Sequence, residues 1–176
     1  MTEPPRSLEQ RTHDTLARLK DDTDLWVATA DGAGVPYLIP LSFRWDGTDL
    51  LLATPADSIT ARNLDKGGRT RLGVGPTRDL VIIEGELRRT TPADEIDEET
   101  AQVFADKTGF DPRREKGMAY FWIRPVRIQA WREANELSGR TLMRNGQWLD
   151  ERTATAAHEA RAEDGYEHEH GHGHEG

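Results

Sequence analysis

The segment from Val35 to Trp45 constrains the fold of this chain more than any other feature. Its apolar side chains occupy alternate positions, and the positions between them are mostly proline or polar. Strict alternation is typical of a β-strand that buries one face. Pro36 and Pro40 share the other parity, and proline donates no hydrogen bond to a neighbouring strand. We therefore expect this strand to lie at a sheet edge, a bulge or a barrel seam.

Shorter apolar runs, separated by turn residues, repeat on both sides of this segment. They predict further strands at Leu25–Thr29, Leu50–Thr54, Thr70–Val74, Leu80–Leu87 and Ala119–Trp131. Because short turns join most neighbours, we expect an antiparallel arrangement. So many strands in a short stretch favour closure into a barrel, which removes exposed edges. The predicted fold is mainly β, an antiparallel barrel with flanking helices.

Helices are expected at the margins of the barrel. A capping box at Ser7 predicts a helix over Leu8–Lys20. A second, short helix over Ser58–Leu64 should stop at the glycines that follow it. Thr91 as N-cap, with proline at the next position and acidic residues after it, predicts the start of a third helix. A further short element is expected over Leu137–Leu149.

These elements divide the chain into three parts. We expect an N-terminal helix in residues 1–24, a barrel domain in residues 25–150, and an acidic, histidine-rich tail in residues 151–176.

Charge and composition exclude several classes of function. The formal net charge of -9 argues against nucleic-acid binding, which needs a basic surface. Cysteine is absent, which excludes disulfides, thiolate metal sites and a cysteine nucleophile. No apolar run approaches the roughly 18 residues that span a bilayer, and the polar start carries no signal-peptide core. We expect a cytoplasmic protein without membrane or nucleic-acid partners.

The junction between the strand that ends at Thr54 and the short helix is the most informative site candidate. Ser58 and Thr60 place hydroxyls on the first turn of this helix, and Arg62 and Asn63 follow. Free amides at a helix N-terminus attract anions, and a guanidinium adds charge-assisted hydrogen bonds suited to phosphate. The alternative is an ordinary capped helix with Arg62 in solvent.

The order and spacing of four segments resemble the pyridoxamine 5′-phosphate oxidase-like superfamily, in particular its actinobacterial branch that uses FMN or the deazaflavin F420. The segments are Trp26–Thr29, Gly34–Phe43, Leu52–Thr54 and Ser58–Leu64. The resemblance implies a split β-barrel homodimer with the cofactor at the subunit interface, and hydride transfer to or from a small organic substrate. It places the phosphate at Thr54, Ser58, Thr60, Arg62 and Asn63, and the cofactor ring against Ile39, Pro40 and Leu41.

The chain also departs from this pattern. No lysine lies between Lys20 and Lys66, and the C-terminal arginine and histidine pattern of the B6 enzyme is not evident, so we do not expect vitamin B6 oxidation. Arg140, Arg144 and Trp148 either reach the cofactor or substrate in a partner subunit, or form a C-terminal clamp with Trp148 packed on the barrel.

No side chain stands out as a catalytic acid or base. A hydride-transfer enzyme tolerates this, because the cofactor carries the chemistry. The alternative function is a non-catalytic flavin- or F420-binding or sensing module.

Two expectations concern arginine and histidine. Arginine far outnumbers lysine, as in GC-rich genomes where F420 is common, and Arg69, Arg71 and Arg78 could line a groove for the oligoglutamate of F420. In the tail, histidines alternate with glutamate and glycine, and imidazoles bind nickel, zinc or copper. We expect weak metal affinity, adventitious or dedicated, at His168, His170, His172 and His174.

Overall fold

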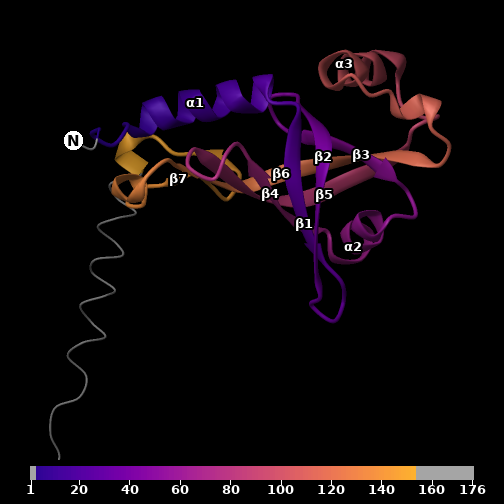
Figure 1. The fold of residues 1–176 in the computed structure, drawn as a ribbon, viewed down its shortest axis with the longest axis horizontal. Coiled ribbons are helices and arrows are strands. Elements are labelled where there is room, and N and C mark those ends of the chain that lie inside the picture. Colours follow the sequence, from indigo (N-terminus) through magenta and orange to yellow (C-terminus); the bar gives the residue numbers. More distant parts are fainter. Residues whose placement is uncertain (1–2, 154–176) are drawn as a thin grey trace, which may run out of the picture.

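The computed structural model describes residues 3–153, and six antiparallel strands form a closed barrel at its centre (Figure 1). The sheet runs in the order β3-β2-β1-β4-β5-β6 and closes where β3 pairs with β6. Two short strands, β7 and β8, extend the sheet beyond β6. The predicted antiparallel barrel with flanking helices is confirmed. The strands are β1 (Asp24–Ala30), β2 (Pro36–Trp45), β3 (Leu50–Pro55), β4 (Arg69–Val74), β5 (Leu80–Pro92), β6 (Met118–Trp131), β7 (Thr141–Arg144) and β8 (Gln147–Trp148).

Between residues 3 and 150, three α-helices lie around the barrel. They are α1 (Leu8–Asp21), α2 (Ile59–Gly67) and α3 (Glu98–Thr108). Helix α1 begins at the predicted residue, and α2 begins one residue after its predicted start. The hydroxyl of Ser7 accepts the amide of Gln10 and so caps α1. Two single-turn 3-10 helices, η1 (Pro112–Arg114) and η2 (Ala134–Glu136), follow α3 and β6. No helix within residues 3–153 is long and apolar enough to cross a membrane.

The predicted start of the third helix at Thr91 is wrong. Strand β5 continues through this residue, which pairs with Tyr120 of β6. The helix α3 begins only at Glu98, where Asp97 caps it by accepting the amide of Thr100 at 2.8 Å. A long ladder with β6 therefore overrides the local capping signal at Thr91. The element expected over Leu137–Leu149 is the β7–β8 hairpin.

Strand β2 belongs to the closed barrel over only part of its length. Its residues 36–42 pair with β1, and only residues 43–45 pair with β3. One edge of β2 is therefore open along the stretch that contains Pro36 and Pro40, where a missing amide breaks no ladder. The edge predicted from these prolines is confirmed. Figure 1 shows the β1–β2 hairpin projecting below the barrel.

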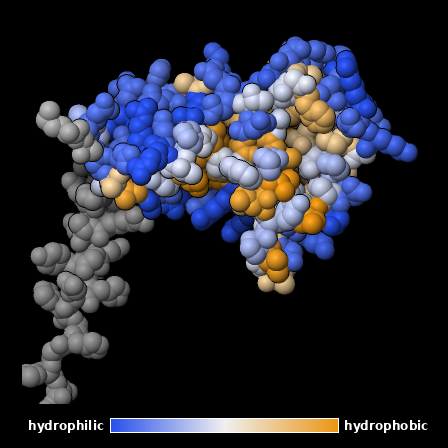
Figure 2. Space-filling model, viewed as in Figure 1, coloured by the Kyte–Doolittle hydropathy of each residue, from blue (hydrophilic) through white to orange (hydrophobic). Residues whose placement is uncertain are grey.

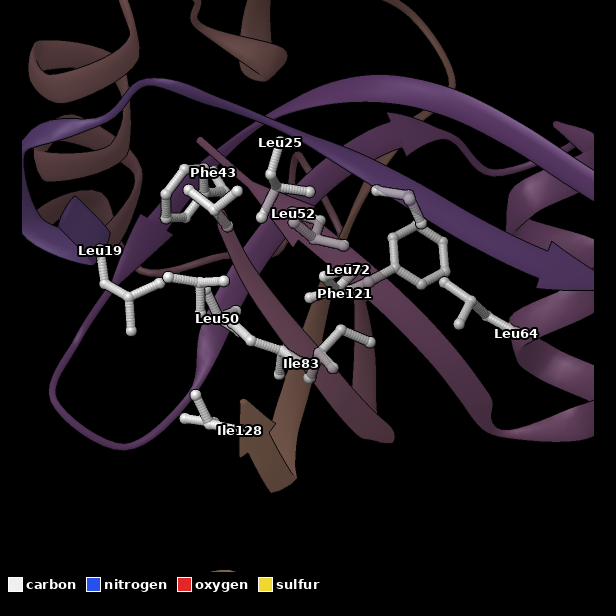
Figure 3. Packing of buried hydrophobic residues seen from close by; sticks show 14 of the residues in the cluster. Leu19, Leu25, Phe43, Leu50, Leu52, Leu64, Leu72, Ile83, Phe121 and Ile128 are labelled. Carbon is white, nitrogen blue, oxygen red and sulfur yellow. The ribbon is translucent and has the colours of Figure 1, made fainter. Parts of the chain in front are cut away.

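Alternate residues of all six strands fill the barrel. Figure 3 shows side chains from different strands pointing toward one another in its interior. Each of the large apolar side chains among them is almost completely buried, and burying such a side chain stabilises the folded state by about 1.5–3 kcal/mol. Leu19 of α1 and Leu64 of α2 lie at opposite ends of this group of buried side chains. The labelled strand residues are Leu25, Phe43, Leu50, Leu52, Leu72, Ile83, Phe121 and Ile128.

The N-terminal segment is tied to the loop between β6 and β7 by a buried ion pair. Arg6 donates to both carboxylate oxygens of Glu136, through Nε at 2.9 Å and Nη2 at 2.8 Å. The backbone amides of Arg6 and Arg132 donate to the same carboxylate, at 3.0 and 2.8 Å. The hydrogen bonds from Arg6 outweigh the effect of burial and lower the pKa of Glu136 to about 2.

The lowered pKa of Glu136 predicts that part of the free energy of unfolding is lost in acid. Because folding lowers the pKa of Glu136 from 4.5 to about 2, its contribution is complete above pH 4.5 and is lost as the pH falls toward 2. We expect about 2–3 kcal/mol of the free energy of unfolding to disappear across that window. Urea unfolding at several acidic pH values measures this. Glu136→Gln should lack this component, and an identical pH dependence in the variant would contradict the assignment.

Candidate functional site

The start of α2 presents unpaired backbone amides. Ser58 Oγ accepts the amide of Ala61 at 3.1 Å, and the carbonyl of Ser58 accepts the amide of Arg62 at 3.0 Å. The first two amides of the helix, those of Ile59 and Thr60, have no acceptor of this kind. Together with the positive end of the helix dipole, they form a place where an anion is stabilised.

Hydroxyl groups gather behind these amides. Thr54, at the end of β3, is buried, and its hydroxyl donates to Ser58 Oγ at 3.3 Å. The hydroxyl of Thr60 is fully buried and has no partner within residues 3–153. An unsatisfied buried hydroxyl costs about 1–3 kcal/mol. The orphaned group therefore fits a site where a ligand offers an acceptor.

Arg62 and Asn63 have different surroundings. Arg62 is exposed, and its guanidinium folds back to donate to the carbonyl of Asp57, which keeps the charge beside the helix start. Asn63 is buried, and its amide donates to Thr29 Oγ1 of β1 at 3.1 Å. The structure thus brings Thr54, Ser58 and Thr60 together with Arg62, whereas Asn63 fastens α2 to β1.

The predicted ring-binding segment lies on the neighbouring strand. Thr29, the partner of Asn63, pairs in register with Tyr37, so α2 is fastened to the part of β1 that pairs with the open stretch of β2. Ile39 and Leu41 are half-buried on the core-facing side, and Pro40 is exposed. Since this stretch has no partner on its second edge, its outward backbone groups can hydrogen-bond a ligand.

The outside of β1, β2 and the hairpin between them carries an exposed apolar surface. We call it the outer apolar face and define it by Trp26, Val35, Leu38 and Pro40. Trp26 is 52% exposed and pairs with Pro40, and Leu38 and Val35 are each 58% exposed. Figure 2 shows hydrophobic surface where β1 runs and on the hairpin below it. Contiguous exposed apolar surface of this kind marks an interaction site.

A cluster of arginines lies on the outside of β6 and β7. Arg127 pairs in register with Arg144, so two like charges lie opposite each other. The amide oxygen of Gln129, in the orientation that satisfies both neighbours, accepts from Arg127 Nη2 and Arg140 Nε at 3.2 Å each. The guanidinium of Arg140 lies 5.1 Å from the ring centroid of Trp131. We call these five residues the basic row.

Sequence analysis named Arg140 and Arg144 but missed the β6 members of the basic row. The signal was the alternation within β6, where Arg127, Gln129 and Trp131 share the parity opposite to buried Ile128 and Ala130. Arg127 and Arg144 lie opposite each other because of the β6–β7 register, which no local sequence pattern indicates. Near this row, Glu84 lies 3.8 Å from Arg127.

The other predicted side chains have clear locations. Trp148 pairs with Met143 and packs against the barrel core. Arg69 and Arg71 line an open groove of about 480 Å³ on β1, β4 and β5, in which Arg71 pairs with Glu84 at 3.0 Å. Arg78 lies elsewhere and pairs with Glu133.

The predicted metal ligands of the tail, His168, His170, His172 and His174, lie outside the described residues. Between residues 3 and 153, no group of three or more histidine, aspartate or glutamate side chains is arranged to hold a metal ion.

Comparison with known proteins identifies the family. The family model described as pyridoxamine 5′-phosphate oxidase matches residues 12–132, more than half of the chain. The chain belongs to the pyridoxamine 5′-phosphate oxidase family. None of the curated proteins compared with it matches the sequence.

Solved structures share the split barrel of this family at low sequence identity. An F420 reductase has a TM-score of 0.55 and 16% identity over 64% of this chain and 93% of its own. HupZ of Group A Streptococcus has a TM-score of 0.54 and 20% identity, covering 68% of this chain and 94% of its own. A FAD-binding protein from Mesorhizobium loti has a TM-score of 0.51 and 16% identity, covering 66% and 89%. At these identities the likeness shows the fold alone.

The orphaned hydroxyl predicts an unusual stability change. Thr60→Val keeps the shape of the side chain and removes an unpartnered buried donor, so it should raise the free energy of unfolding by about 1 kcal/mol. The matched control Thr54→Val removes a hydroxyl that bonds Ser58 and should lower it by a similar amount. Urea unfolding of the ligand-free protein measures both changes. Equal losses in the two variants would contradict this account of the junction.

Proposed function

We propose that this protein is an oxidoreductase that holds FMN or F420 between two copies of the chain and transfers a hydride to or from a small organic substrate. The observation that carries the proposal is the start of α2, where two free amides, the orphaned Thr60 hydroxyl and Arg62 lie in one short segment, in a barrel that leaves one edge of β2 open. Membership of the pyridoxamine 5′-phosphate oxidase family supports it.

The residues at this junction fit a phosphorylated cofactor. A phosphate at the start of α2 would accept from the amides of Ile59 and Thr60, from the hydroxyls of Ser58 and Thr60, and from the guanidinium of Arg62. Thr54 orients Ser58 from behind, and Asn63 fixes the helix to β1.

The ring of the cofactor would lie against the open edge of β2. Within the predicted segment of Ile39, Pro40 and Leu41, the carbonyl of Pro40 faces the open edge and offers a hydrogen bond to a polar ring edge, because β3 pairs only with residues 43–45. The backbone groups of Ile39 and Leu41 face β1. Two structural neighbours, an F420 reductase and a FAD-binding protein, support a flavin-type cofactor.

The charges of the groove on β4 and β5 favour FMN over F420. Arg71 faces Glu84 at 3.0 Å, and Arg69 faces Glu86 at 4.0 Å. The two arginines are therefore matched by two carboxylates and offer no net charge to an oligoglutamate chain. FMN carries its charge on the phosphate alone and needs only the start of α2.

A second copy of the chain would complete the site. The outer surface continues from Trp26 of β1 through Gly73 and Ile82 to Gln129 of β6, because these residues pair in register. A two-fold contact buries the same surface on both copies. It would cover the outer apolar face and bring the basic row of one copy toward the cofactor held by the other, where Arg140 and Trp131 would contact it.

The bound cofactor supplies the hydride chemistry. The chain binds the phosphate, orients the ring against β2, and excludes water by burying the outer apolar face between two copies. The cationic basic row favours cofactor and substrate groups that carry negative charge.

A non-catalytic flavin- or F420-binding or sensing module is the second candidate. The first turn of α2 favours this second candidate. A catalytic acid or base usually has a pKa near neutrality, and no side chain in this turn has an ordinary pKa in that range. Stopped-flow reduction by NADPH or reduced F420 distinguishes the two candidates. The oxidoreductase proposal predicts turnover with an electron acceptor, whereas a binding module holds the cofactor without turnover.

Phosphate recognition predicts a difference between FMN and riboflavin. Arg62→Gln removes a charge-assisted hydrogen bond and should weaken FMN binding by about 1.5–3 kcal/mol. Riboflavin, which lacks the phosphate, should bind both proteins equally. Fluorescence titration measures the affinities, and Lys66→Gln in the last turn of α2 is the matched control. Equal affinity of the unaltered protein for FMN and riboflavin would contradict the assignment of the phosphate site.

The outer apolar face predicts a dimer that one charge disrupts. Leu38→Glu places a carboxylate in the proposed contact and should yield monomers that bind FMN at least tenfold more weakly. Val103→Glu alters an exposed side chain (39%) on α3, outside that face, and should leave a dimer. Size-exclusion chromatography with light scattering measures the mass. A monomeric unaltered protein that binds FMN would contradict the interface proposal.

A further inference from the structure

We infer that Arg6 and Glu136 are positioning residues for the cofactor site, because together they fix the loop that carries Trp131 and Arg140 at its two ends. The inference rests on the proposed function, in which these two side chains contact the cofactor. It assigns a role to an N-terminal arginine that lies 130 positions away from its partner in the sequence.

The residues that flank the loop, which comprises residues 132–139, are joined by a hydrogen bond. The amide of Ala130 donates to the carbonyl of Arg140 at 2.9 Å, and the guanidinium of Arg140 lies over the ring of Trp131. The position of Arg140 therefore depends on how the loop is held.

The carboxylate of Glu136 is the anchor of this loop. It is only 4% exposed, and each of its oxygens accepts two hydrogen bonds. Three of the four donors belong to Arg6 and the fourth is the amide of Arg132, so the anchor joins the N-terminal segment to the loop. A buried carboxylate with four donors holds a defined position, because any displacement leaves charge unsatisfied.

Two further contacts hold the same loop against the N-terminal region. The buried side chain of Arg11 in α1 donates to the carbonyl of Glu136 at 3.4 Å. The side chain of Asn135 donates to the carbonyl of Glu3 at 2.8 Å. These contacts fasten the loop to residues that precede the barrel, in addition to the pair between Arg132 and Asp79 at 3.3 Å.

The loop also provides a matched comparison. Glu133 pairs with Arg78 at 3.0 Å, but these side chains are 50% and 81% exposed. Exposed ion pairs contribute little, because water and salt screen them. Loss of the Arg78 side chain should leave the loop in place, whereas loss of the Arg6 side chain removes two of the four donors to the buried anchor, both of them charged.

A double-mutant cycle tests whether Arg6 acts through Arg140. We expect Arg6→Gln to weaken FMN binding about tenfold, the lower end of the range for second-sphere partners. Arg140→Gln should weaken it at least as much, and the double variant should bind no more weakly than Arg140→Gln alone. In urea unfolding, the two effects on stability should add. Arg78→Gln should leave affinity unchanged, and Arg6→Lys should recover part of the loss.

Hydrogen exchange supplies a readout that does not depend on cofactor. Arg6→Gln should raise the exchange of amides in residues 132–139, and Arg78→Gln should not. If Arg6→Gln does not fold, Arg6→Lys takes its place in the cycle, because a lysine cannot bridge both carboxylate oxygens.

Two results would overturn the inference alone, and a third would also overturn the proposed function. Unchanged FMN affinity in the Arg6 variant would show that Arg6 serves stability alone. Affinity losses that add in the double variant would show that Arg6 does not act through Arg140. An unaltered protein that binds neither FMN nor F420 would overturn the proposed function together with this inference.

Discussion

Closure of the barrel between β3 and β6 is the constraint on which the rest of the structure depends. Six consecutive residues of β3, Leu50–Pro55, pair with β6, and the strand ends at the turn that starts α2. On the other edge of β3, β2 meets it over only three residues, so the first part of β2, which pairs with β1, keeps one edge open. The same arrangement that closes the core thus creates the helix start and the open edge that the proposed function uses.

Charge is distributed so that an acidic protein presents a basic surface at one place. The net charge is -9, yet three arginines lie together on β6 and β7. The arginines on the groove of β4 and β5 are matched by carboxylates, one of which, Glu84, also lies 3.8 Å from Arg127. Arg6 is used for structure, since it satisfies a buried carboxylate that fixes a loop. Burial and pairing therefore separate the arginines that hold the fold from those available to a ligand.

Local patterns predicted the parts of the structure that local physics decides. The alternation from Val35 to Trp45 and its prolines predicted a strand and its open edge, and the segment from Ser58 to Leu64 predicted α2, for which Ser58 proves to be the cap. The cap predicted at Thr91 failed, because a long-range ladder with β6 uses the same residues.

Features that depend on strand register or on partners distant in the sequence could not be predicted from local sequence patterns. Arg127 and Arg144 meet only because β6 and β7 pair in one particular alignment. Nothing near Arg6 in the sequence indicates that its partner is Glu136. The junction at α2 could be predicted because its hydroxyls and amides lie within one short segment, whereas the burial of Asn63 against Thr29 could not.

A crystal structure of the protein grown with FMN tests the central claim most directly. The account predicts two copies related by a two-fold axis, with the phosphate within about 3 Å of the Ile59 and Thr60 amides. The ring should lie along residues 39–41 of one copy, with the basic row of the other copy against it. A phosphate bound elsewhere, or a cofactor enclosed by a single copy, would contradict the account.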